Sequence, residues 1–308
     1  GKIIVGQEAV LERLLICILA RGHGLLMGVP GLAKTMMVHA LADVMSLDFN
    51  RIQFTPDLMP SDITGTDILQ EGDRPGSRAF EFVKGPIFAN IILADEINRT
   101  PPKTQAALLE TMQEGQVTAA GRTMPLDKPF FVLATQNPIE QEGTYPLPEA
   151  QLDRFMFLIQ VDYPSREEEL EIARTTTGDT TAQLEHVIDG AAIMKFQELV
   201  RRVPVPEHVF EHVVSIVRST RPADPASPEW VKNWITWGAG PRAVQYMILA
   251  AKVHAVLHGN YMVQNEDADA LARDVLGHRI VLNFRAESEG MTPATIVDRL
   301  LTEGVAAT

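Results

Sequence analysis

The chain has 308 residues, a length typical of two compact domains, and its apolar content of 45% is too high for a disordered protein. Its formal net charge of −13 disfavours general binding to the phosphate backbone of nucleic acids, although a local basic patch could override this balance. The single cysteine, Cys17, excludes an intramolecular disulfide and favours a reducing compartment such as the cytoplasm, and no apolar run is long enough to span a bilayer.

The first half of the chain alternates short apolar runs with helical patterns. It starts at Gly1 and not at Met, so we expect preceding residues to be missing, and it shows no secretory signal pattern. Strands are expected over residues 24–27, 49–54, 91–94, 130–134 and 155–161, and helices over 35–45 and 104–113. This alternation predicts an α/β fold, a parallel sheet with helices on both faces.

After Tyr163-Pro164 the pattern changes to helices without a convincing strand. Ser165 is followed three residues later by Glu168, a capping-box pattern that predicts the start of a helix. Helices are expected over residues 166–175, 191–202, 207–220, 228–236, 241–257, 266–283 and 293–302. We therefore expect two domains, an α/β domain over 1–162 and a smaller all-α domain over 163–308.

A glycine-rich loop follows the first expected strand and opens a helix. It reads Gly28-Val29-Pro30-Gly31-Leu32-Ala33-Lys34-Thr35. In this context the backbone N–H groups turn inward and form a cradle for phosphates, and the helix N-terminus adds positive potential. We expect Lys34 to reach the β- and γ-phosphates of ATP and the Thr35 hydroxyl to bind Mg²⁺. Ala33 stands where glycine is usual, which leaves the affinity of the loop for ATP open.

Two acidic residues, Asp95 and Glu96, follow directly after the apolar run 91–94. P-loop NTPases hold Mg²⁺ through an Asp at the C-terminal end of a strand, so Asp95 is expected to be a protein ligand of Mg²⁺ beside Thr35. Glu96 is placed to polarise the attacking water and to accept its proton, which a neutral amide could not do. The sequence therefore predicts a P-loop site for Mg²⁺-dependent ATP hydrolysis.

The order of these motifs resembles the AAA+ ATPases, and the resemblance covers nearly the whole chain. The loop 28–35 and the string Leu-Ala-Asp-Glu-Ile-Asn-Arg at 93–99 are similar to those of the MoxR group. The segment 54–84 resembles the helix-2 insert of the MoxR, magnesium-chelatase and MCM-like branch, and residues 115–123 resemble the hairpin that precedes the sensor-1 strand. The chain thus resembles a MoxR-type AAA+ ATPase with an α/β core and a helical lid.

The resemblance implies roles for three further polar residues. Asn137 matches the sensor-1 position, where an amide orients the water and contacts the γ-phosphate. Arg154 matches the arginine finger that reaches the ATP of the neighbouring subunit, and a structural Arg–Asp pair is the alternative. Arg242, after Gly240-Pro241, matches the sensor-2 position that contacts the γ-phosphate from the lid.

The opening segment 2–8 resembles the part of the family that packs against adenine, with Ile4, Val5 and Gly6 as the candidate residues. A core contact near the N-terminus is the alternative interpretation. The resemblance also implies a hexameric ring and a partner protein of the von Willebrand A type. It further implies action on protein clients, either in the maturation of protein complexes or in the insertion of metal cofactors. A membrane span and nucleic-acid binding are not expected.

Three functions remain open at this point. A chaperone-like ATPase that remodels protein clients is favoured by the motifs, the negative charge and the MoxR-like strings. A DNA-directed motor of the MCM-like or helicase-loader kind is favoured by the insert and the hairpin, and disfavoured by the acidic charge. A nucleotide-controlled scaffold with little turnover is favoured by Ala33 alone.

Two groups of residues are not assigned to a ligand. The eight histidines show no ligand spacing with cysteine or carboxylate, so the sequence predicts no zinc site. Trp230, Trp234 and Trp237 follow each other at helical spacing, which predicts packing in the core of the second domain.

Overall fold

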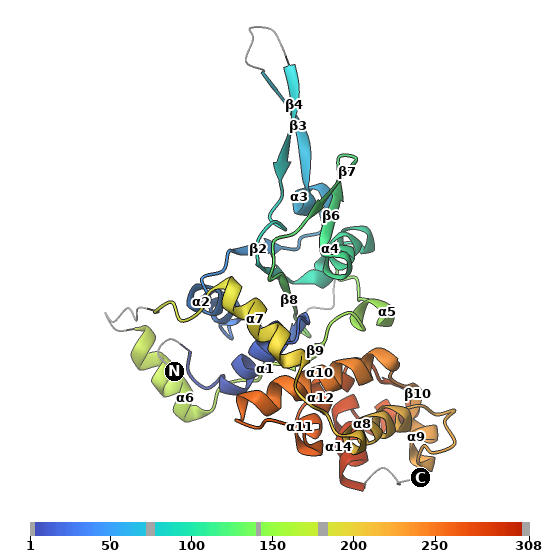
Figure 1. The fold of residues 1–308 in the computed structure, drawn as a ribbon. Helices are drawn as coiled ribbons and strands as arrows, with labels where there is room; N and C mark the ends of the chain where they lie inside the picture. Colours follow the sequence, from blue (N-terminus) through green and yellow to red (C-terminus); the bar gives the residue numbers. More distant parts are fainter. Residues whose placement is uncertain (1–3, 72–77, 140–142, 178–183, 304–308) are drawn as a thin grey trace. The chain divides into compact units, whose positions relative to one another are not determined.

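The protein is represented by a computed structural model that describes residues 4–71, 78–139, 143–177 and 184–303 (Figure 1). Its contacts divide it into two compact units. Unit 1 comprises Gly1–Leu11, Leu25–Leu147 and Gln160–Ile193, and unit 2 comprises Glu12–Gly24, Pro148–Ile159 and Met194–Thr308. Within the described ranges, no helix is long and apolar enough to cross a membrane.

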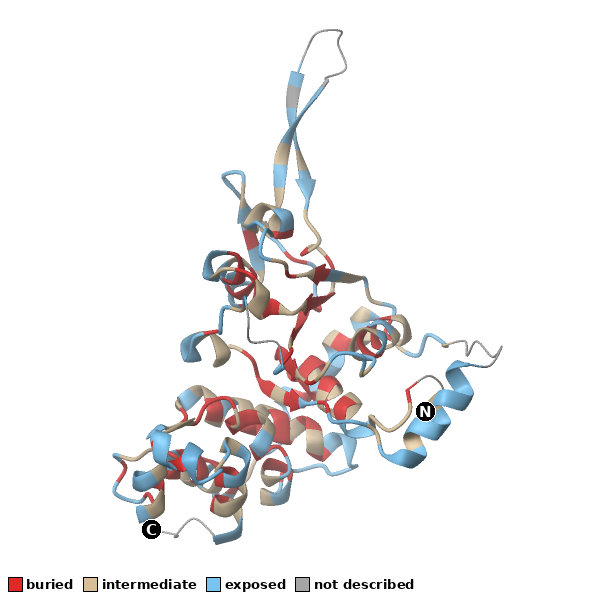
Figure 2. Ribbon diagram, turned by 180° about the vertical axis from the view of Figure 1, so that it is seen from behind, coloured by how far each residue is buried: buried red, intermediate tan, exposed pale blue. Residues whose placement is uncertain are grey.

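The central sheet has five strands in the order β2-β5-β8-β1-β9. They are β1 (Gly24–Met27), β2 (Phe49–Gln53), β5 (Ile91–Asp95), β8 (Phe131–Gln136) and β9 (Phe157–Gln160). β5 pairs in parallel with β2 on one side and β8 on the other. Residues 91–94 are fully buried, as expected for a central strand, because both faces of such a strand are covered (Figure 2). The predicted α/β fold is confirmed.

The helices expected over 35–45 and 104–113 are confirmed with bounds shifted by one or two residues, whereas the helices over 8–19 and 60–64 were not predicted. The helices that lie in unit 1 are α2 (Lys34–Val44), α3 (Pro60–Thr64), the 3₁₀ turn η1 (Ile97–Arg99), α4 (Pro102–Glu114) and α6 (Arg166–Thr176). Two others, α1 (Glu8–Leu19) and α7 (Gly190–Arg201), contribute residues to both units. Helix α4 ends at Gly115, which adopts a φ of 62°, a left-handed conformation that glycine takes without strain.

Two antiparallel hairpins project from unit 1 (Figure 1). β3 (Gly65–Glu71) pairs with β4 (Arg78–Lys84) inside the segment predicted as an insert, although residues 72–77 of that segment lie outside the described ranges. β6 (Gln116–Ala119) pairs with β7 (Arg122–Pro125), which confirms the predicted hairpin before β8. The described residues of the first hairpin are mostly exposed or half-buried (Figure 2). Its exposed residues include the large apolar side chains of Leu69 and Phe80.

Unit 2 is built around the long helix α10 (Pro241–Leu257), which carries a buried row of alanine, valine and methionine side chains. The other elements are α5 (Glu149–Leu152), α8 (Glu207–Ser219), α9 (Glu229–Trp234), α11 (Asn265–Asp269), α12 (Ala272–Leu276), α13 (Phe284–Ser288), α14 (Pro293–Glu303), β10 (Ile235–Trp237) and β11 (Val281–Leu282). α10 packs against α8, α11 and α12. Small side chains on α10 allow these close helix contacts, so the unit has a compact apolar core.

The expectation of helices alone after residue 163 is wrong in two places. The expected helix 228–236 ends at Trp234, and β-branched Ile235 and Thr236 continue as β10, which pairs with β11. The expected helix 266–283 is divided into α11, α12 and β11. The pairing of β10 with β11 joins residues far apart in sequence, so no local periodicity could predict this pairing.

The three tryptophans do not form a core cluster. Trp237 lies on β10 and is 70% exposed. The rings of Trp230 and Trp234 are 5.7 Å apart, and the guanidinium of Arg299 lies over both, at 4.5 and 5.2 Å from their centroids. The prediction of core packing is therefore wrong for Trp237, and the other two are half-buried, with their rings tilted against each other beneath an arginine.

Helix α6 provides a test of local capping. Ser165 and Glu168 form the predicted capping box, with Ser165 Oγ accepting from Glu168 N at 3.3 Å and Glu168 Oε2 accepting from Ser165 N at 2.6 Å. None of the residues of α6, all of which are described, is buried. The helix therefore depends on local interactions more than on packing.

We expect Ser165→Ala to destabilise α6 by about 1 kcal/mol, because the backbone N–H of Glu168 loses its hydrogen-bond partner. Backbone amide exchange over 166–176 should become faster, while the melting temperature of the whole chain changes little. Thr175→Ala, which removes an exposed hydroxyl from the same helix, is the control. Unchanged exchange in the Ser165 variant would contradict the capping role.

Candidate nucleotide-binding site

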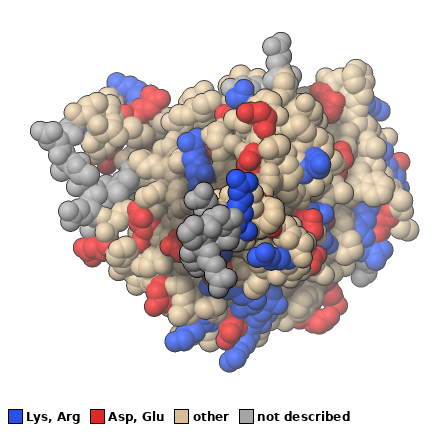
Figure 3. Space-filling model, turned by 90° about the horizontal axis from the view of Figure 1, so that it is seen from above, with Lys and Arg blue, Asp and Glu red and all other residues tan. Residues whose placement is uncertain are grey.

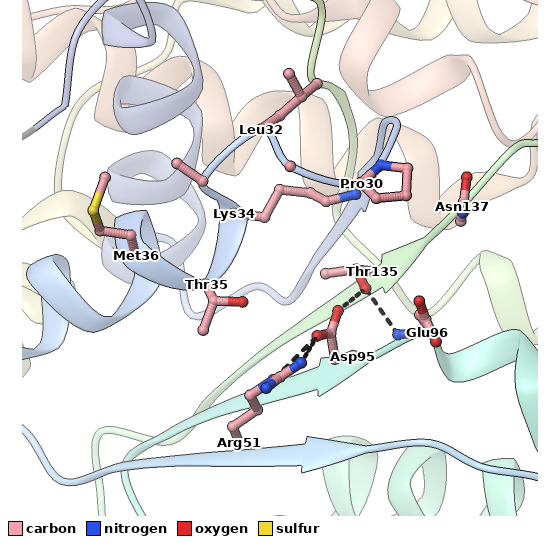
Figure 4. A pocket seen from close by; sticks show the side chains of 12 residues that line it. Pro30, Leu32, Lys34, Thr35, Met36, Arg51, Asp95, Glu96, Thr135 and Asn137 are labelled. Atoms are coloured by element: carbon pink, nitrogen blue, oxygen red, sulfur yellow. Dashed lines mark hydrogen bonds and ion pairs between the residues drawn. The ribbon is translucent and has the colours of Figure 1, made fainter. Parts of the chain in front are cut away.

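A cavity of about 490 Å³ lies in unit 1, where the glycine-rich loop meets the C-terminal ends of β5 and β8 (Figure 4). It is lined by Pro30, Gly31, Leu32, Ala33, Lys34, Thr35, Met36, Arg51, Asp95, Glu96, Thr135 and Asn137. Open parallel sheets bind their ligands at this edge, because the ends of several strands and the loops that follow them converge there. The structure thus brings together the predicted loop, the acidic pair and Asn137.

Two glycines shape the loop for different reasons. Gly31 has a φ of 85°, and a Cβ at that position would meet no atom of the described residues within 4 Å, so conformation and not space requires glycine. A Cβ on Gly28 would lie 2.6 Å from the carbonyl oxygen of Val161, so space requires glycine here. Gly28 and Val29 directly precede the first lining residue of the cavity, Pro30, but do not line the cavity themselves.

Ala33 stands where glycine is usual and adopts a left-handed backbone conformation. It has a φ of 54° and a ψ of 21° and is the N-cap of α2. Glycine adopts this left-handed conformation without strain, whereas alanine pays about 1 kcal/mol for it. The turn into α2 is thus formed in spite of the side chain, and the loop keeps the inward-facing shape of a phosphate cradle.

Lys34 lies beneath the loop, where its ammonium donates to the carbonyl oxygen of Gly28 at 2.5 Å (Figure 4). Burial lowers the pKa of Lys34, and the nearby carboxylates of Asp95 and Glu96 oppose this shift. The cation is therefore half-desolvated in a loop that would surround phosphates, where a positive charge acts most strongly.

The carboxylate of Asp95 is fixed through both of its oxygens. Thr135 Oγ1 donates to Asp95 Oδ1 at 2.6 Å and accepts from the backbone N–H of Glu96 at 2.8 Å. The guanidinium of Arg51 forms an ion pair with Asp95 Oδ2 at 2.6 Å. Asp95 and the Thr35 hydroxyl line the same cavity, and hard oxygen donors of this kind suit Mg²⁺. Carboxylate oxygens retain further lone pairs, so the donor set fits the ion.

Glu96 adopts a left-handed backbone conformation, with a φ of 55° and a ψ of 50°. Such conformations are costly outside glycine and cluster at functional sites. Its Oε2 accepts from Gln53 Nε2 at 3.0 Å and from Arg99 Nη1 at 3.1 Å. Both donors reach the same oxygen, so the structure orients this carboxylate at the end of β5.

Asn137 is buried and follows directly after β8. Its Oδ1 accepts from the backbone N–H of Ile139 at 3.1 Å, which closes a turn at Asn137-Pro138. The turn occupies the oxygen of the amide, and the NH₂ group can still donate into the cavity that Asn137 lines. The turn and the sensor role are therefore compatible.

Ile4, Val5 and Gly6 also belong to unit 1 but do not line this cavity. Ile4 is buried, and Gly6 has a φ of 72° with the Glu168 side chain so close that a Cβ would lie 2.3 Å from its Cδ. Lys2 and Ile3, from the same predicted segment, lie outside the described residues. The contact of this segment with adenine remains a prediction.

Arg154 and Arg242 belong to unit 2. Arg242 Nη1 donates to Asp153 Oδ2 at 3.0 Å, and the backbone carbonyl of Arg154 accepts from the Tyr246 hydroxyl at 3.1 Å. The Arg–Asp pair expected as an alternative thus involves Arg242 rather than Arg154. The roles of both arginines towards ATP remain predictions.

The segment that carries Arg154 is anchored by Arg279, which the sequence analysis did not single out. The Arg279 guanidinium, only 2% exposed, donates to Asp153 Oδ1 at 2.8 Å and to the carbonyl oxygens of Asp153 and Phe155. Burial lowers the pKa of Arg279, and its hydrogen bond and charge interaction with Asp153 oppose the shift. A buried cation that bonds so many backbone acceptors fixes the local path of the chain.

Four residues around the acidic pair were missed in the sequence: Arg51, Gln53, Arg99 and Thr135. Arg51 and Gln53 lie on β2, whose register places Gln53 opposite Asp95. Only the strand order makes these residues neighbours of the acidic pair, so no local signal could have found them. Thr135 stands directly before Gln136 and Asn137, and polar residues at the end of an apolar run were the available signal.

The fold and the cavity define a P-loop nucleotide-binding protein with an α/β core and a helical second part. The profile of the ATPase family associated with various cellular activities (AAA) matches residues 23–157, and that of the AAA lid domain matches residues 229–300. Chaperone MoxR1 of Mycobacterium tuberculosis is 46% identical over 300 residues, which cover 97% of this chain and 78% of the relative. The chain belongs to the MoxR family of AAA+ ATPases.

Two further comparisons agree with this assignment. Protein MoxR of Paracoccus denitrificans is 30% identical over 316 aligned residues, covering 96% of this chain and 90% of the relative. A crystal structure of a candidate ATPase from Cytophaga hutchinsonii superimposes with a TM-score of 0.91 at 46% identity, covering 99% of this chain and 91% of that one. The similarity therefore extends over both units and not only over the phosphate loop.

Substitutions at Ala33 test the strain in the loop. We expect Ala33→Gly to keep the thermal stability within about 1 kcal/mol of the wild type, because relief of strain offsets the larger entropy of the unfolded chain. Ala33→Val should be clearly less stable, since a β-branched residue is disfavoured at positive φ. Thermal melts with and without a slowly hydrolysed ATP analogue measure both effects. Equal stability of the two variants would show that Ala33 is not strained.

Thr135 is expected to position both acidic residues. Thr135→Val keeps the shape but leaves Asp95 Oδ1 and the Glu96 N–H without this partner, which costs about 1–3 kcal/mol for each buried group. ATP turnover should fall by about 10–100-fold, whereas Thr135→Ser should stay close to the wild type. Thr123→Val, on the exposed hairpin strand β7, is the control. Equal turnover of the Val and Ser variants would contradict the role of the hydroxyl.

Proposed function

We propose that this chain hydrolyses ATP in the presence of Mg²⁺ and uses the cycle to remodel protein clients, as a chaperone-like motor. The observation that carries the proposal is that Lys34, Thr35, Asp95, Glu96 and Asn137 all line one cavity. A phosphate cradle, hard oxygen ligands, a carboxylate base and an amide are the groups that ATP hydrolysis requires. Membership of an ATPase family supports the same activity.

Different residues of the cavity would bind the phosphates and the metal ion. The backbone of the loop and the Lys34 ammonium would hold the β- and γ-phosphates. Thr35 and Asp95 would hold Mg²⁺, which would supply positive charge against the negative charge that develops on the phosphates. Thr135 keeps the Asp95 carboxylate directed into the cavity through its hydrogen bond.

Glu96 and Asn137 would act on the attacking water. Glu96 Oε2 is held by Gln53 and Arg99, so the other oxygen, Oε1, is the one that would accept the proton of the water. The Asn137 amide would donate to the water or the γ-phosphate while its oxygen stays in the turn. The left-handed backbone at Glu96 keeps this carboxylate in place before the substrate binds.

Unit 2 would complete the site through its arginines, with Arg154 as a finger for a neighbouring subunit and Arg242 as a sensor for the γ-phosphate. Arg242 would exchange its partner Asp153 for phosphate when ATP binds. We retain the proposal of an α/β domain over 1–162 and a lid over 163–308. An arginine supplied in trans accounts for a ring, for which the family resemblance implies a hexamer.

The relatives support a protein client. One of them carries the name of a chaperone, MoxR1. A von Willebrand A partner and the insertion of metal cofactors are finer proposals that rest on the family resemblance alone. Cys17 is buried and free, in agreement with a reducing compartment, so we propose action in the cytoplasm.

A DNA-directed motor is the second candidate, because the β3–β4 hairpin and the β6–β7 hairpin are present. The net charge of −13 argues against it. On the face shown in Figure 3, acidic side chains lie among the basic ones. Salt-sensitive DNA binding with DNA-stimulated hydrolysis would favour this candidate over the chaperone-like motor.

The first experiment measures ATP turnover per subunit with Mg²⁺ at rising protein concentration. Specific activity should rise with concentration, because subunits complete each other's sites. Glu96→Gln should bind ATP but lose at least about 100-fold in turnover, the usual contribution of a general base. A wild type without turnover at any concentration would favour the nucleotide-controlled scaffold.

A mixing experiment tests Arg154 in trans. Arg154→Ala and Glu96→Gln should each be inactive alone, yet a mixture should recover activity, since a Glu96→Gln subunit can still donate its arginine. Random mixing in equal amounts completes about one quarter of the interfaces in a ring. Arg166→Ala, an exposed arginine on α6, should behave as the wild type. A mixture that stays inactive would contradict a finger supplied by the neighbour.

A further inference from the structure

Two histidines and a glutamate meet in unit 2, away from the residues that line the nucleotide cavity. His254 lies on α10, His258 follows one turn later as the residue that caps the C-terminal end of this helix, and Glu12 lies on α1. Glu12 Oε1 is 4.0 Å from His254 Nε2 and 3.8 Å from His258 Nε2. The two imidazole rings are stacked with centroids 4.1 Å apart, and one ligand atom from each of the three residues lies within 4.8 Å of the other two.

The other nitrogen of each ring is already bound. His254 Nδ1 is 2.7 Å from Asp267 Oδ1, and His258 Nδ1 is 2.9 Å from the backbone carbonyl oxygen of His254. A carboxylate and a carbonyl only accept, so both Nδ1 atoms carry the hydrogen, and each Nε2 of a neutral ring presents its lone pair. This arrangement, in which a second partner orients the ring, is the one that metal-ligating histidines adopt.

Glu12 completes the cluster with an unsatisfied oxygen. Its Oε1 is buried and has no hydrogen-bond partner among the described residues, while its Oε2 lies 3.5 Å from Arg13. Arg13 is itself directed to Asp274 at 2.8 Å, so the arginine does not neutralise Oε1. Three lone-pair donors therefore face one another, and a cation between them removes their repulsion.

We propose that Glu12, His254 and His258 bind a divalent transition metal ion of the Zn²⁺ type. Imidazole nitrogens with one carboxylate suit zinc and its neighbours, whereas Mg²⁺ takes oxygen ligands. Ligand atoms around tetrahedral zinc lie about 3.4 Å apart, so the two distances from Glu12 Oε1 to the histidine nitrogens need to shorten by about half an ångström. His258 is half-exposed, and three protein ligands leave one position for water.

The proposal departs from the sequence-based expectation that the histidines bind no zinc. His254 and His258 have the spacing of one helical turn, but the carboxylate comes from the other end of the chain. The ion would join α1 to α10 inside unit 2 and stabilise that unit by an amount that grows with metal concentration. It acts independently of ATP hydrolysis, since none of its ligands lines the nucleotide cavity.

The test uses the full chain, stripped of metal with a chelator and free of nucleotide. Titration with zinc chloride by calorimetry should show one saturable equivalent, and Zn²⁺ should raise the melting temperature. Glu12→Gln and His258→Ala should each weaken binding by at least about tenfold, and Asp267→Asn by about 10–100-fold, because it orients His254. His212→Ala, which removes a histidine paired with Asp269 elsewhere in unit 2, should bind as the wild type.

Cobalt(II) provides a second readout that a change in folding does not mimic. The visible absorption of Co²⁺ bound to the wild type should disappear in His258→Ala while the circular dichroism of that variant stays unchanged. Absence of saturable binding, or equal binding in the wild type, Glu12→Gln and His258→Ala, would overturn the proposal.

Discussion

The parallel pairing of β5 with β2 and β8 is the constraint on which the candidate site depends. In this register Gln53 lies opposite Asp95, and Ala94 lies opposite Ala134, so three strands end at one edge. A shift by one residue would turn Asp95 to the opposite face of the sheet. The buried apolar residues of β5 hold that register, so the core of unit 1 also determines the geometry of the acidic pair.

Two residues of the site other than glycine have strained backbone conformations. Ala33 and Glu96 both have positive φ, one at the start of α2 and the other after β5. Surrounding contacts compensate for such strain, and here Thr135 binds the backbone N–H of Glu96. The cavity is therefore arranged before any ligand enters, which is the property that makes fixed dipoles effective in phosphoryl transfer.

Unit 2 has its own organising interaction, the buried guanidinium of Arg279. It binds the backbone at Asp153 and Phe155, on either side of Arg154, and shares Asp153 with Arg242. The Asp153 carboxylate thus connects Arg242 to Arg279, and Arg154 is the next residue along the chain. If Arg242 exchanged Asp153 for another partner, the hydrogen bonds of Asp153 would change next to Arg154. This link gives unit 2 a physical means of coupling Arg242 to Arg154.

The sequence by itself determined the α/β class, the phosphate loop, the acidic pair and most helices, because these are local patterns of periodicity and spacing. The tertiary structure decided what depends on pairing across the chain. It placed Arg51 and Gln53 beside Asp95 and Glu96, broke the expected helices 228–236 and 266–283 through the β10–β11 pair, and brought Glu12 to His254 and His258. Contacts between residues distant in sequence leave no local signal, since their partners are chosen only when the chain folds.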